Sequence, residues 1–492
     1  KREQLGSVVG ITEQFINILT EQNVRASLAS LKPTDIRIEP ELGAFSAGDF
    51  DHLPKAVPVG EAAARKAAPR LSALSLAPAA YAELRAKQGP VEPPPPAPVA
   101  EIRFDGLKRV NPATLEEIID TTPGRPLDKA VLDRDLRRIY GTGDFERLDY
   151  RVLREGDRQV VMIDATEKEW GPNYLRFGLG LVSDFSEGNA FNLAASYRRT
   201  WLDSLGAEWR VFAQVGQSAG LATEYYQPLA VGHGLFVAPR AAGWRNTLNL
   251  YQQSDRIATY NVRQAALGVD LGVDFTRYGE VRLGVETGML RAALNTGPPS
   301  LAPPPGIIGT GGIRLRAIVD QLDNVNFPRS GYAALVDVDS QVKGLGADFL
   351  YVKWEADAAI AFASGRHSLT LSAKAGGAGG SDPLPAYDQF FWGGFLQQSG
   401  YPTASLAGAE LTFGRAIYLY RLAEVRLIGP VYAGASLELG RMGKPLVPGN
   451  TTDLLTSSAL FLGAATPIGP FYRGFGFAAD GIRSAYLFLG RP

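Results

Sequence analysis

One short motif has the spacing of a serine nucleophile: Gly216-Gln217-Ser218-Ala219-Gly220. In a nucleophile elbow, the serine lies on a strained turn between a strand and a helix, which presents its hydroxyl for attack. Here strand-like sequence lies on both sides, since Tyr225 and Tyr226 continue the pattern downstream, and no general base stands at a suitable place. The motif therefore predicts a hairpin turn of small residues and no catalytic role for Ser218.

The composition limits other site chemistry. The chain has no cysteine, which excludes disulfides, thiolate zinc sites and a cysteine nucleophile. Its three histidines, His52, His233 and His367, are far apart and have no acid or histidine at ligand spacing. With 50 basic and 51 acidic residues, the chain shows no basic surface for nucleic acid. We expect no catalytic residue, no metal and no cofactor in this chain.

From about residue 172 onward, the apolar residues recur at every second position. Val281, Leu283 and Val285 point one way, whereas Arg282 and Glu286 point the other way. Similar alternation occurs at 332–339, where the second face includes Asp337 and Asp339, and at 352–358, where charged residues occupy every second position. Charges at alternate positions fit a water-filled lumen better than the dry core of a sandwich. No window approaches the ~18 consecutive apolar residues of a transmembrane helix.

About sixteen such segments follow one another, and the connections between them alternate in length. Short connections such as 203–207 and 363–367 follow even strands, and longer ones such as 295–309 and 380–408 more often follow odd strands. Short turns on one side and long loops on the other are typical of an outer-membrane barrel. The expected strands begin near Tyr174, Phe191, Glu208, Gly220, Gly234, Ala258, Gly279, Thr310, Ser330, Phe349, Ser368, Ala409, Val431, Thr456, Pro470 and Ser484.

Aromatic residues gather near the ends of the expected strands, where they could form a girdle at the membrane interface. Ordinary β-propensity is the alternative explanation. The residues in question are Trp201, Tyr225, Tyr226, Trp244, Trp392, Tyr418, Tyr420, Phe471 and Tyr472.

Two smaller segments precede the barrel. Residues 1–88 are mostly helical in pattern, with a helix through Ile11 and Leu19, a short strand-like alternation at Ile36 and Ile38, and a second helix near 59–71. The segment 89–100 contains four consecutive prolines and predicts a semi-rigid linker.

Residues 101–169 have a βααββ pattern. Asn111-Pro112 is an N-cap followed by proline, and Gly141 is a plausible C-cap of the second helix. The predicted fold class is thus mainly β: an antiparallel transmembrane β-barrel of about 16 strands at 170–492, preceded by one βααββ domain and a small helical remnant.

Three local patterns resemble the Omp85/two-partner-secretion superfamily of outer-membrane transporters. The stretch from Asp320 to Tyr332 resembles a turn that this superfamily has between two mid-barrel strands, and 466–470 resembles its turn before the last two strands. The βααββ unit resembles a POTRA domain, with Tyr140-Gly141-Thr142-Gly143-Asp144-Phe145 after its second helix. The residues of the mid-barrel turn motif are Asp320, Asp323, Asn324, Phe327, Pro328, Gly331 and Tyr332.

The superfamily also has an inward-folded sixth loop with an Arg-Gly-Tyr-type tip. The matching stretch is 391–401, and Ser399 stands where the superfamily commonly has arginine. The resemblance implies that this arginine would tie the loop to acidic groups of the barrel wall, whereas a hydroxyl could make a weaker bond. A glycine-rich loop without a special role is the alternative. The candidate residues are Gly393, Gly394, Ser399, Gly400 and Tyr401.

Residues 1–88 resemble the C-terminal end of a patatin-like lipase domain, through 36–45, 48–50 and 60–63. Together with a POTRA domain and a barrel, this is the arrangement of type Vd autotransporters. The resemblance places the catalytic serine and aspartate of such a lipase upstream of Lys1. We also expect one or a few residues after Pro492, since outer-membrane barrels usually end on an aromatic residue.

The resemblance implies an outer-membrane translocator or anchor for a patatin-like passenger, with the N-terminal domains in the periplasm unless the passenger is exported. Its partners would be outer-membrane lipids, its own N-terminal passenger and the barrel-assembly machinery, with a homodimer possible and no nucleic acid. One alternative is a phospholipase or esterase that acts through an upstream Ser-Asp dyad. Another is a passive outer-membrane pore.

Overall fold

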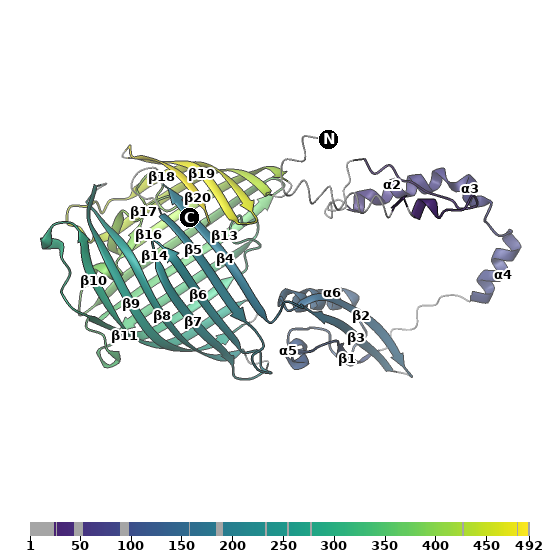
Figure 1. Ribbon diagram of the computed structural model, residues 1–492, viewed down its shortest axis with the longest axis horizontal. Coiled ribbons are helices and arrows are strands. Elements are labelled where there is room, and N and C mark those ends of the chain that lie inside the picture. Colours follow the sequence, from purple (N-terminus) through teal and green to yellow (C-terminus); the bar gives the residue numbers. More distant parts are fainter. Residues whose placement is uncertain are drawn as a thin grey trace. The chain divides into compact units, whose positions relative to one another are not determined.

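The computed structural model describes residues 24–25, 27–43, 53–88, 98–156, 158–183, 190–231, 234–252, 255–275, 278–425, 428–479 and 481–490. The chain divides into two compact units, residues 1–95 and 96–492 (Figure 1). The helix expected through Ile11 and Leu19 lies outside the described residues, as do His52 and His233.

The described part of the first unit contains the helices α2 (Leu53–Lys66), α3 (Ala68–Ser72) and α4 (Pro78–Gln88). The single helix expected near 59–71 is wrong, because it is two helices that meet at Ala67. Pro69 lies in the first turn of α3 and has no N–H to continue the hydrogen bonds of α2. None of the helices in the described ranges is long and apolar enough to cross a membrane.

The strand-like alternation at Ile36 and Ile38 does not form a strand. Residues 35–42 have no regular secondary structure. A strand needs a neighbour for its backbone hydrogen bonds, and the described residues of the first unit offer no such partner.

The second unit begins with a βααββ domain. Its elements are β1 (Val99–Asp105), α5 (Pro112–Glu116), α6 (Lys129–Gly141), β2 (Phe145–Glu155) and β3 (Arg158–Glu167). The strands form one sheet in the order β1-β3-β2, with β1 parallel and β2 antiparallel to β3. The central strand, β3, is the most buried one, as expected for a strand covered by neighbours on both edges.

Of the two helix caps expected in this domain, the N-cap is confirmed and the C-cap is wrong. The Asn111 side chain accepts a hydrogen bond from the Ala113 N–H, which makes it the N-cap of α5. Gly141 is not the C-cap of α6, because the helix includes it and Thr142 follows as the cap. The left-handed residue that lets the chain leave the helix is Gly143, with φ of 86°.

Seventeen strands close one barrel, of which β15 (Phe390–Trp392) has only three residues, so sixteen strands span it (Figure 1). Neighbouring strands are antiparallel throughout, and β20 closes the ring by pairing with β4. The spanning strands are β4 (Asn173–Ser183), β5 (Ala190–Arg199), β6 (Glu208–Gly216), β7 (Ala219–Pro228), β8 (Leu235–Gln252), β9 (Asp255–Asp274), β10 (Gly279–Thr296), β11 (Ile308–Asp320), β12 (Gly331–Gln341), β13 (Tyr351–Ser364), β14 (His367–Gly380), β16 (Leu406–Val425), β17 (Gly429–Pro445), β18 (Leu455–Thr466), β19 (Gly469–Ala478) and β20 (Arg483–Leu489).

The expected barrel of about sixteen strands is confirmed, and each expected start lies within three residues of an observed one. The strands differ in length more than expected, since β9 and β16 have 20 residues each and β20 has seven. A tilted spanning strand needs about 9–11 residues. The additional residues of the long strands therefore extend beyond the apolar zone.

The alternation of apolar and charged residues separates the outside of the barrel from its lumen. Leu283 and Val285 of β10 are 55% and 47% exposed, as expected for side chains that face lipid. Directly before Leu283 in the sequence, the Arg282 side chain is only 12% exposed and forms ion pairs inside the barrel. Period-two patterning thus predicts correctly which face of a strand is wet.

The expected aromatic girdle is only partly correct. Tyr225 and Tyr418 are well exposed, as a lipid-facing ring should be. In contrast, Tyr472 is 5% exposed and packs inside the barrel, and Trp392 contacts Phe413 in the loop region. Aromatic residues near strand ends therefore occur on both the lipid-facing and the lumen-facing side of the barrel. The residue type alone does not predict which side it faces.

Candidate functional site: the barrel lumen and its inward loop

The loop between β14 and β16 (381–405, here called the inward loop) starts from an anchor on β13. Lys353 of β13 donates to the Asp388 backbone carbonyl over 2.6 Å and pairs with its carboxylate over 2.8 Å. The Tyr351 hydroxyl donates to the same carboxylate over 2.8 Å. Directly after this anchor, β15 pairs with the first residues of β16. The base of the loop is thus attached to the wall on both sides.

The tip of the inward loop is held in conformations that most residues avoid. Gly393, Gly394 and Gly400 have φ of 117°, 106° and 104°. Leu396 and Gln398, which are not glycines, also have positive φ, 59° and 77°. Such a residue costs on the order of 1–3 kcal/mol and persists only where its surroundings hold it in place. The contacts of the tip supply that support.

One buried carboxylate, Glu438 of β17, accepts three hydrogen bonds from the tip, more than any other described residue of the wall makes with it. The N–H groups of Gln398 and Ser399 donate to it over 2.9 and 2.6 Å. The Ser399 and Ser436 hydroxyls donate over 2.9 and 2.6 Å. The Glu438 residue is fully buried. Four donors on a single carboxylate offset much of the free energy lost when a charge leaves water.

A cation also stands near this carboxylate, but it belongs to the barrel wall. Arg415 of β16 interacts electrostatically with Glu438 and donates a hydrogen bond of 2.5 Å to the Leu396 carbonyl. Ser399 itself makes hydrogen bonds with Glu438 without carrying charge. The tip is therefore joined to the wall by a serine from the loop and an arginine from the strand.

The wall under the tip is lined with glycines. A Cβ at Gly476 of β19 would lie 2.5 Å from the Gly400 nitrogen, and one at Gly440 of β17 would lie 2.3 Å from the Gln398 side-chain oxygen. Gly400 in turn could not carry a side chain, since its Cβ would lie 2.6 Å from the Ala478 nitrogen. The loop and the wall approach each other so closely because none of these positions has a side chain.

The last strand also binds the tip. The Tyr486 hydroxyl of β20 accepts from the Gly400 N–H over 2.9 Å and donates to the Tyr401 carbonyl over 3.1 Å. The Ser484 hydroxyl donates to the Gly400 carbonyl over 2.7 Å. The inward loop therefore contacts the strand that closes the barrel.

The mid-barrel turn between β11 and β12 is built by its own side chains. Asp323 accepts from the Arg329 and Ser330 N–H groups over 2.8 and 3.1 Å, and Asn324 accepts from the Phe327 N–H over 2.9 Å. Asp320 accepts from the Leu322 N–H over 3.1 Å. These bonds give the turn a fixed shape without a strand partner.

Phe327 connects this turn to the aromatic side of the lumen. It is 3% exposed and stacks on Tyr432 with ring centroids 4.8 Å apart. It also contacts Tyr472, which in turn contacts Phe395 of the inward loop at 5.7 Å. The turn and the loop thus join one buried cluster, whose members are Phe327, Phe395, Leu396, Leu419, Tyr432, Ala459, Phe461, Tyr472, Tyr486 and Phe488.

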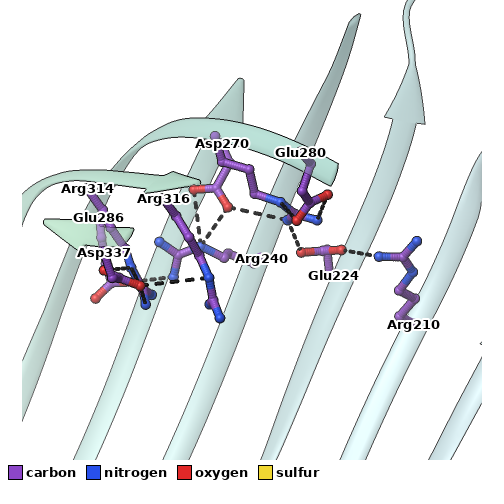
Figure 2. Close-up of polar contacts among 10 residues, drawn as sticks. Arg210, Glu224, Arg240, Asp270, Glu280, Glu286, Arg314, Arg316 and Asp337 are labelled. Carbon is purple, nitrogen blue, oxygen red and sulfur yellow. Dashed lines mark hydrogen bonds and ion pairs between the residues drawn. The ribbon is translucent and has the colours of Figure 1, made fainter. Parts of the chain in front are cut away.

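The opposite wall of the lumen carries a network of alternating charges (Figure 2). Arg282 of β10 pairs with Glu280 and, at 2.7 Å, with Glu224 of β7. Arg240 pairs with Asp270 at 3.2 Å and also with Glu286. The network extends to further pairs, which are Arg210–Glu224, Arg314–Asp337 and Arg316–Asp337. This wall is polar, yet its charges are balanced within the protein.

Open space remains beside the loop and at one end of the barrel. A cavity of about 580 Å³ lies between β11–β14 and the loop residues Trp392 and Gln397. A second one, of about 840 Å³, is lined by β4–β8 and by residues 141–144 of the βααββ domain. The Asn111 side chain of that domain donates to the Ser204 carbonyl over 2.8 Å. The βααββ domain therefore borders one mouth of the lumen.

No catalytic arrangement occurs at the motif that resembles a nucleophile elbow. Residues 217–218 form the turn between β6 and β7, and no helix follows. No group of three or more His, Asp or Glu side chains that could hold a metal ion is found in the described ranges. His367, the one histidine within them, contacts the Tyr418 hydroxyl at 2.6 Å near a strand end.

Sequence reasoning names the tip residues but misses their partners. Glu438 is not among the predicted residues, although Ser436 and Glu438 are polar at alternate positions of a stretch, 431–439, that is otherwise apolar or glycine. That pattern was a usable signal for a lumen-facing pair. The glycines opposite the tip give no such signal, because only the contacts show what a side chain there would meet.

Comparisons with known proteins agree with this architecture. Residues 186–469, more than half of the chain, match the Omp85 superfamily domain. A stretch of 70 residues, 14% of this chain, is 29% identical to the outer membrane protein assembly factor BamA of Nitratidesulfovibrio vulgaris and spans only 9% of that protein.

Solved structures resemble the chain over most of its length. BamA from Haemophilus ducreyi lacking POTRA domains 1–3 matches with a TM-score of 0.60 and 13% identity, over 80% of this chain and 84% of that one. CdiB from Acinetobacter baumannii gives 0.53 and 12%, over 80% and 74%. CdiB from Escherichia coli gives 0.52 and 14%, over 98% of both chains. At these identities the structures show likeness of fold.

The matched domain, the closed sixteen-stranded barrel and the polar lumen lead to one assignment. This chain belongs to the Omp85 superfamily, and its barrel lies in the bacterial outer membrane.

Proposed function

We propose that this protein is a translocator that moves a polypeptide through or along its barrel, and that the seam between β20 and β4 is the part that opens. The observation that carries the proposal is the shortness of this seam. Leu487–Leu489 pair with Leu181–Ser183, three residues on each strand. Every other neighbouring pair of spanning strands is matched over seven or more residues in the described ranges. Among the residues that the structure describes, this seam therefore has the fewest backbone hydrogen bonds of any pair of neighbouring spanning strands.

The charged wall of the lumen suits such a role. A passing chain meets carboxylates and guanidinium groups that already pair with each other, as Arg282 does with Glu224 and Glu280. Since these charges are compensated, they hold water without binding an extended polypeptide tightly. The inward loop covers the other wall, and its position decides how wide the conduit is.

The βααββ domain, which we propose is a POTRA domain, would receive the client in the periplasm. Its sheet leaves β2 as an edge strand, with free backbone groups along one side. An extended segment can add to such an edge by backbone hydrogen bonds. The domain borders the cavity at the barrel mouth, so a segment bound there would lie close to the lumen.

The client, we propose, is a patatin-like lipase domain in the same chain, as in type Vd autotransporters. The support is the sequence resemblance of residues 36–45, 48–50 and 60–63. Esterase activity should be absent from the present chain and should appear when the upstream segment is included. Activity from the present chain alone would contradict this assignment.

A cross-link across the seam tests translocation. The chain has no cysteine, so Leu181→Cys with Leu489→Cys introduces the only possible disulfide, between directly opposite residues. Leu283→Cys with Leu315→Cys is the matched control, because these residues are opposite one another on β10 and β11. The readout is exposure of the N-terminal passenger to protease added outside intact cells.

The oxidised seam variant should lose passenger exposure, and reductant should restore it, whereas the control should behave as wild type. If the oxidised seam variant exposes its passenger as well as the control does, seam opening is not part of the function. A passive open pore predicts a different result: deleting 381–405 would leave ionic conductance unchanged, and sealing the seam would not affect exposure of the passenger.

A further inference from the structure

Three arginines form one row across the outside of the barrel. Arg263 of β9 lies directly opposite Arg245 of β8 and Arg291 of β10 in the strand register. The three strands are neighbours in the barrel, and their long arrows lie side by side in Figure 1. All three arginines are exposed. Directly opposite residues of antiparallel strands have their Cβ atoms only about 4.5–5.5 Å apart.

The face of this row is the lipid-facing one. On β9, Arg263 shares its face of the strand with Leu267, Val269 and Leu271, which are 63%, 45% and 53% exposed. On β10, Met289 is 56% exposed, two positions before Arg291. Residues at every second position of a strand share one face. The arginines therefore lie on the same lipid-facing side of the barrel as these apolar residues.

The row lies at the external boundary of the apolar band. β10 begins at Gly279, on the same side of the barrel as the start of β4, where the βααββ domain enters. The ten residue-to-residue steps from Val281 to Arg291 rise roughly 34 Å along the strand. A strand tilt of about 40° reduces this to roughly 25 Å of height, which matches the ~25 Å apolar band of such barrels. The guanidinium groups therefore lie at the level of the head groups of the outer leaflet.

Within the described ranges, the protein supplies no counter-charge for these arginines. None of the three forms an ion pair or a side-chain hydrogen bond there, whereas the arginines of the lumen are paired. The outward positions next to the row are Gly243, Ala265 and Met289 on one side and Thr247, Asn261 and Ala293 on the other. Like charges directly opposite each other destabilise a sheet. An external anion would remove this cost.

We propose that Arg245, Arg263 and Arg291 bind the phosphate groups of a phosphorylated lipid in the outer leaflet of the outer membrane. Guanidinium groups bind phosphate in a bidentate way, and three in a row can hold more than one phosphate oxygen pair. The apolar face directly below the row receives the acyl chains of the same molecule. The site thus combines charge and hydrophobic contact in the arrangement of a lipid with an anionic head.

The test uses the purified full chain in detergent micelles, with bisphosphorylated lipid A as the probe and retained lipid measured by native mass spectrometry. The variant is R245Q/R263Q/R291Q. The matched control is R134Q/R137Q/R147Q, which removes three exposed arginines of the βααββ domain. A third protein, R245K/R263K/R291K, keeps the charge. Retention of the compact form on unheated gels verifies that each barrel is folded.

We expect the glutamine variant to bind lipid A about tenfold more weakly than wild type, since charge-assisted bonds are lost. The control should bind as wild type, and the lysine variant should lie between them. Dephosphorylated lipid A should bind wild type as weakly as the glutamine variant binds lipid A. The proposal is wrong if the glutamine variant binds lipid A as well as wild type does, or if wild type does not distinguish the two lipids. It is also wrong if millimolar inorganic phosphate displaces the lipid, because the site would then recognise phosphate without the membrane.

Discussion

The carboxylates on the two walls of the lumen have different kinds of partners. On β7–β12, each carboxylate of the network in Figure 2 pairs with an arginine, and all of them except the buried Asp270 are partly accessible to water. On β16–β20, the one buried carboxylate, Glu438, receives N–H and O–H donors from the inward loop. Removing a partner from the first wall leaves a charge that water can reach. Removing Glu438 leaves donors that water cannot reach, so the second wall should be the more sensitive one.

Glu438→Ala should have the largest effect. The Gln398 and Ser399 N–H groups would lose their acceptor in a buried place, at a cost of about 3 kcal/mol or more. The loop would leave the wall, which should raise single-channel conductance and lower the temperature at which the barrel loses its compact form on gels. Glu438→Gln keeps an acceptor and should show a smaller change in both. Unchanged conductance and stability in Glu438→Ala would show that the loop is held by other contacts.

Glu167 of the βααββ domain is another carboxylate that accepts hydrogen bonds from backbone N–H groups. Because its pKa is shifted, the stability that it contributes depends on pH. Burial raises the pKa of Glu167, but hydrogen bonds from the backbone of Arg109, Val110 and Lys108 outweigh this and hold the pKa below 4.5. The stability that this group contributes is therefore present above pH 4.5 and is lost as the pH falls through the lowered value.

Glu167→Gln should destabilise this region by about 1–2 kcal/mol at neutral pH, because an acceptor of three N–H groups loses its charge. Hydrogen exchange at Lys108–Val110, corrected for intrinsic rates, measures the change. Wild type and variant should converge as the pH falls below 4.5. A constant difference across this range would mean that the charge of Glu167 is not what stabilises the segment.

Arg282→Met tests the first wall and should have a moderate effect, about 1 kcal/mol, since water can hydrate Glu224 and Glu280 once the guanidinium is gone. The lumen should become more cation-selective, as measured by the reversal potential in a salt gradient. Arg137→Met, an exposed arginine of the βααββ domain, is the control. A loss of stability as large as that of Glu438→Ala would remove the distinction between the two walls.

Ser218→Ala should have the smallest effect, within about 0.5 kcal/mol, because its side chain occupies a hairpin turn. Esterase activity should be undetectable in wild type and variant alike. Activity that disappears in Ser218→Ala would show that the motif is catalytic.

The barrel was largely predictable because lipid and water impose a period of two on every spanning strand. Val281, Leu283 and Val285 face outward as expected, and the turn at 216–220 lies between strands as expected. The bond between Ser399 and Glu438 could not be predicted, since it joins residues 39 positions apart through the fold. The three-residue strand β15 is too short to show a period, and the break at Ala67 depends on a single proline.

The ring of Tyr472 touches Phe327 on one side and Phe395 on the other. Phe327 belongs to a turn on the side of the barrel where the βααββ domain enters, and Phe395 belongs to the inward loop. Close-packed aromatic rings transmit a displacement because they cannot be compressed. A displacement of the turn is therefore transmitted through the three rings to the inward loop. The end of the barrel where the βααββ domain enters is thus mechanically connected to the interior of the barrel.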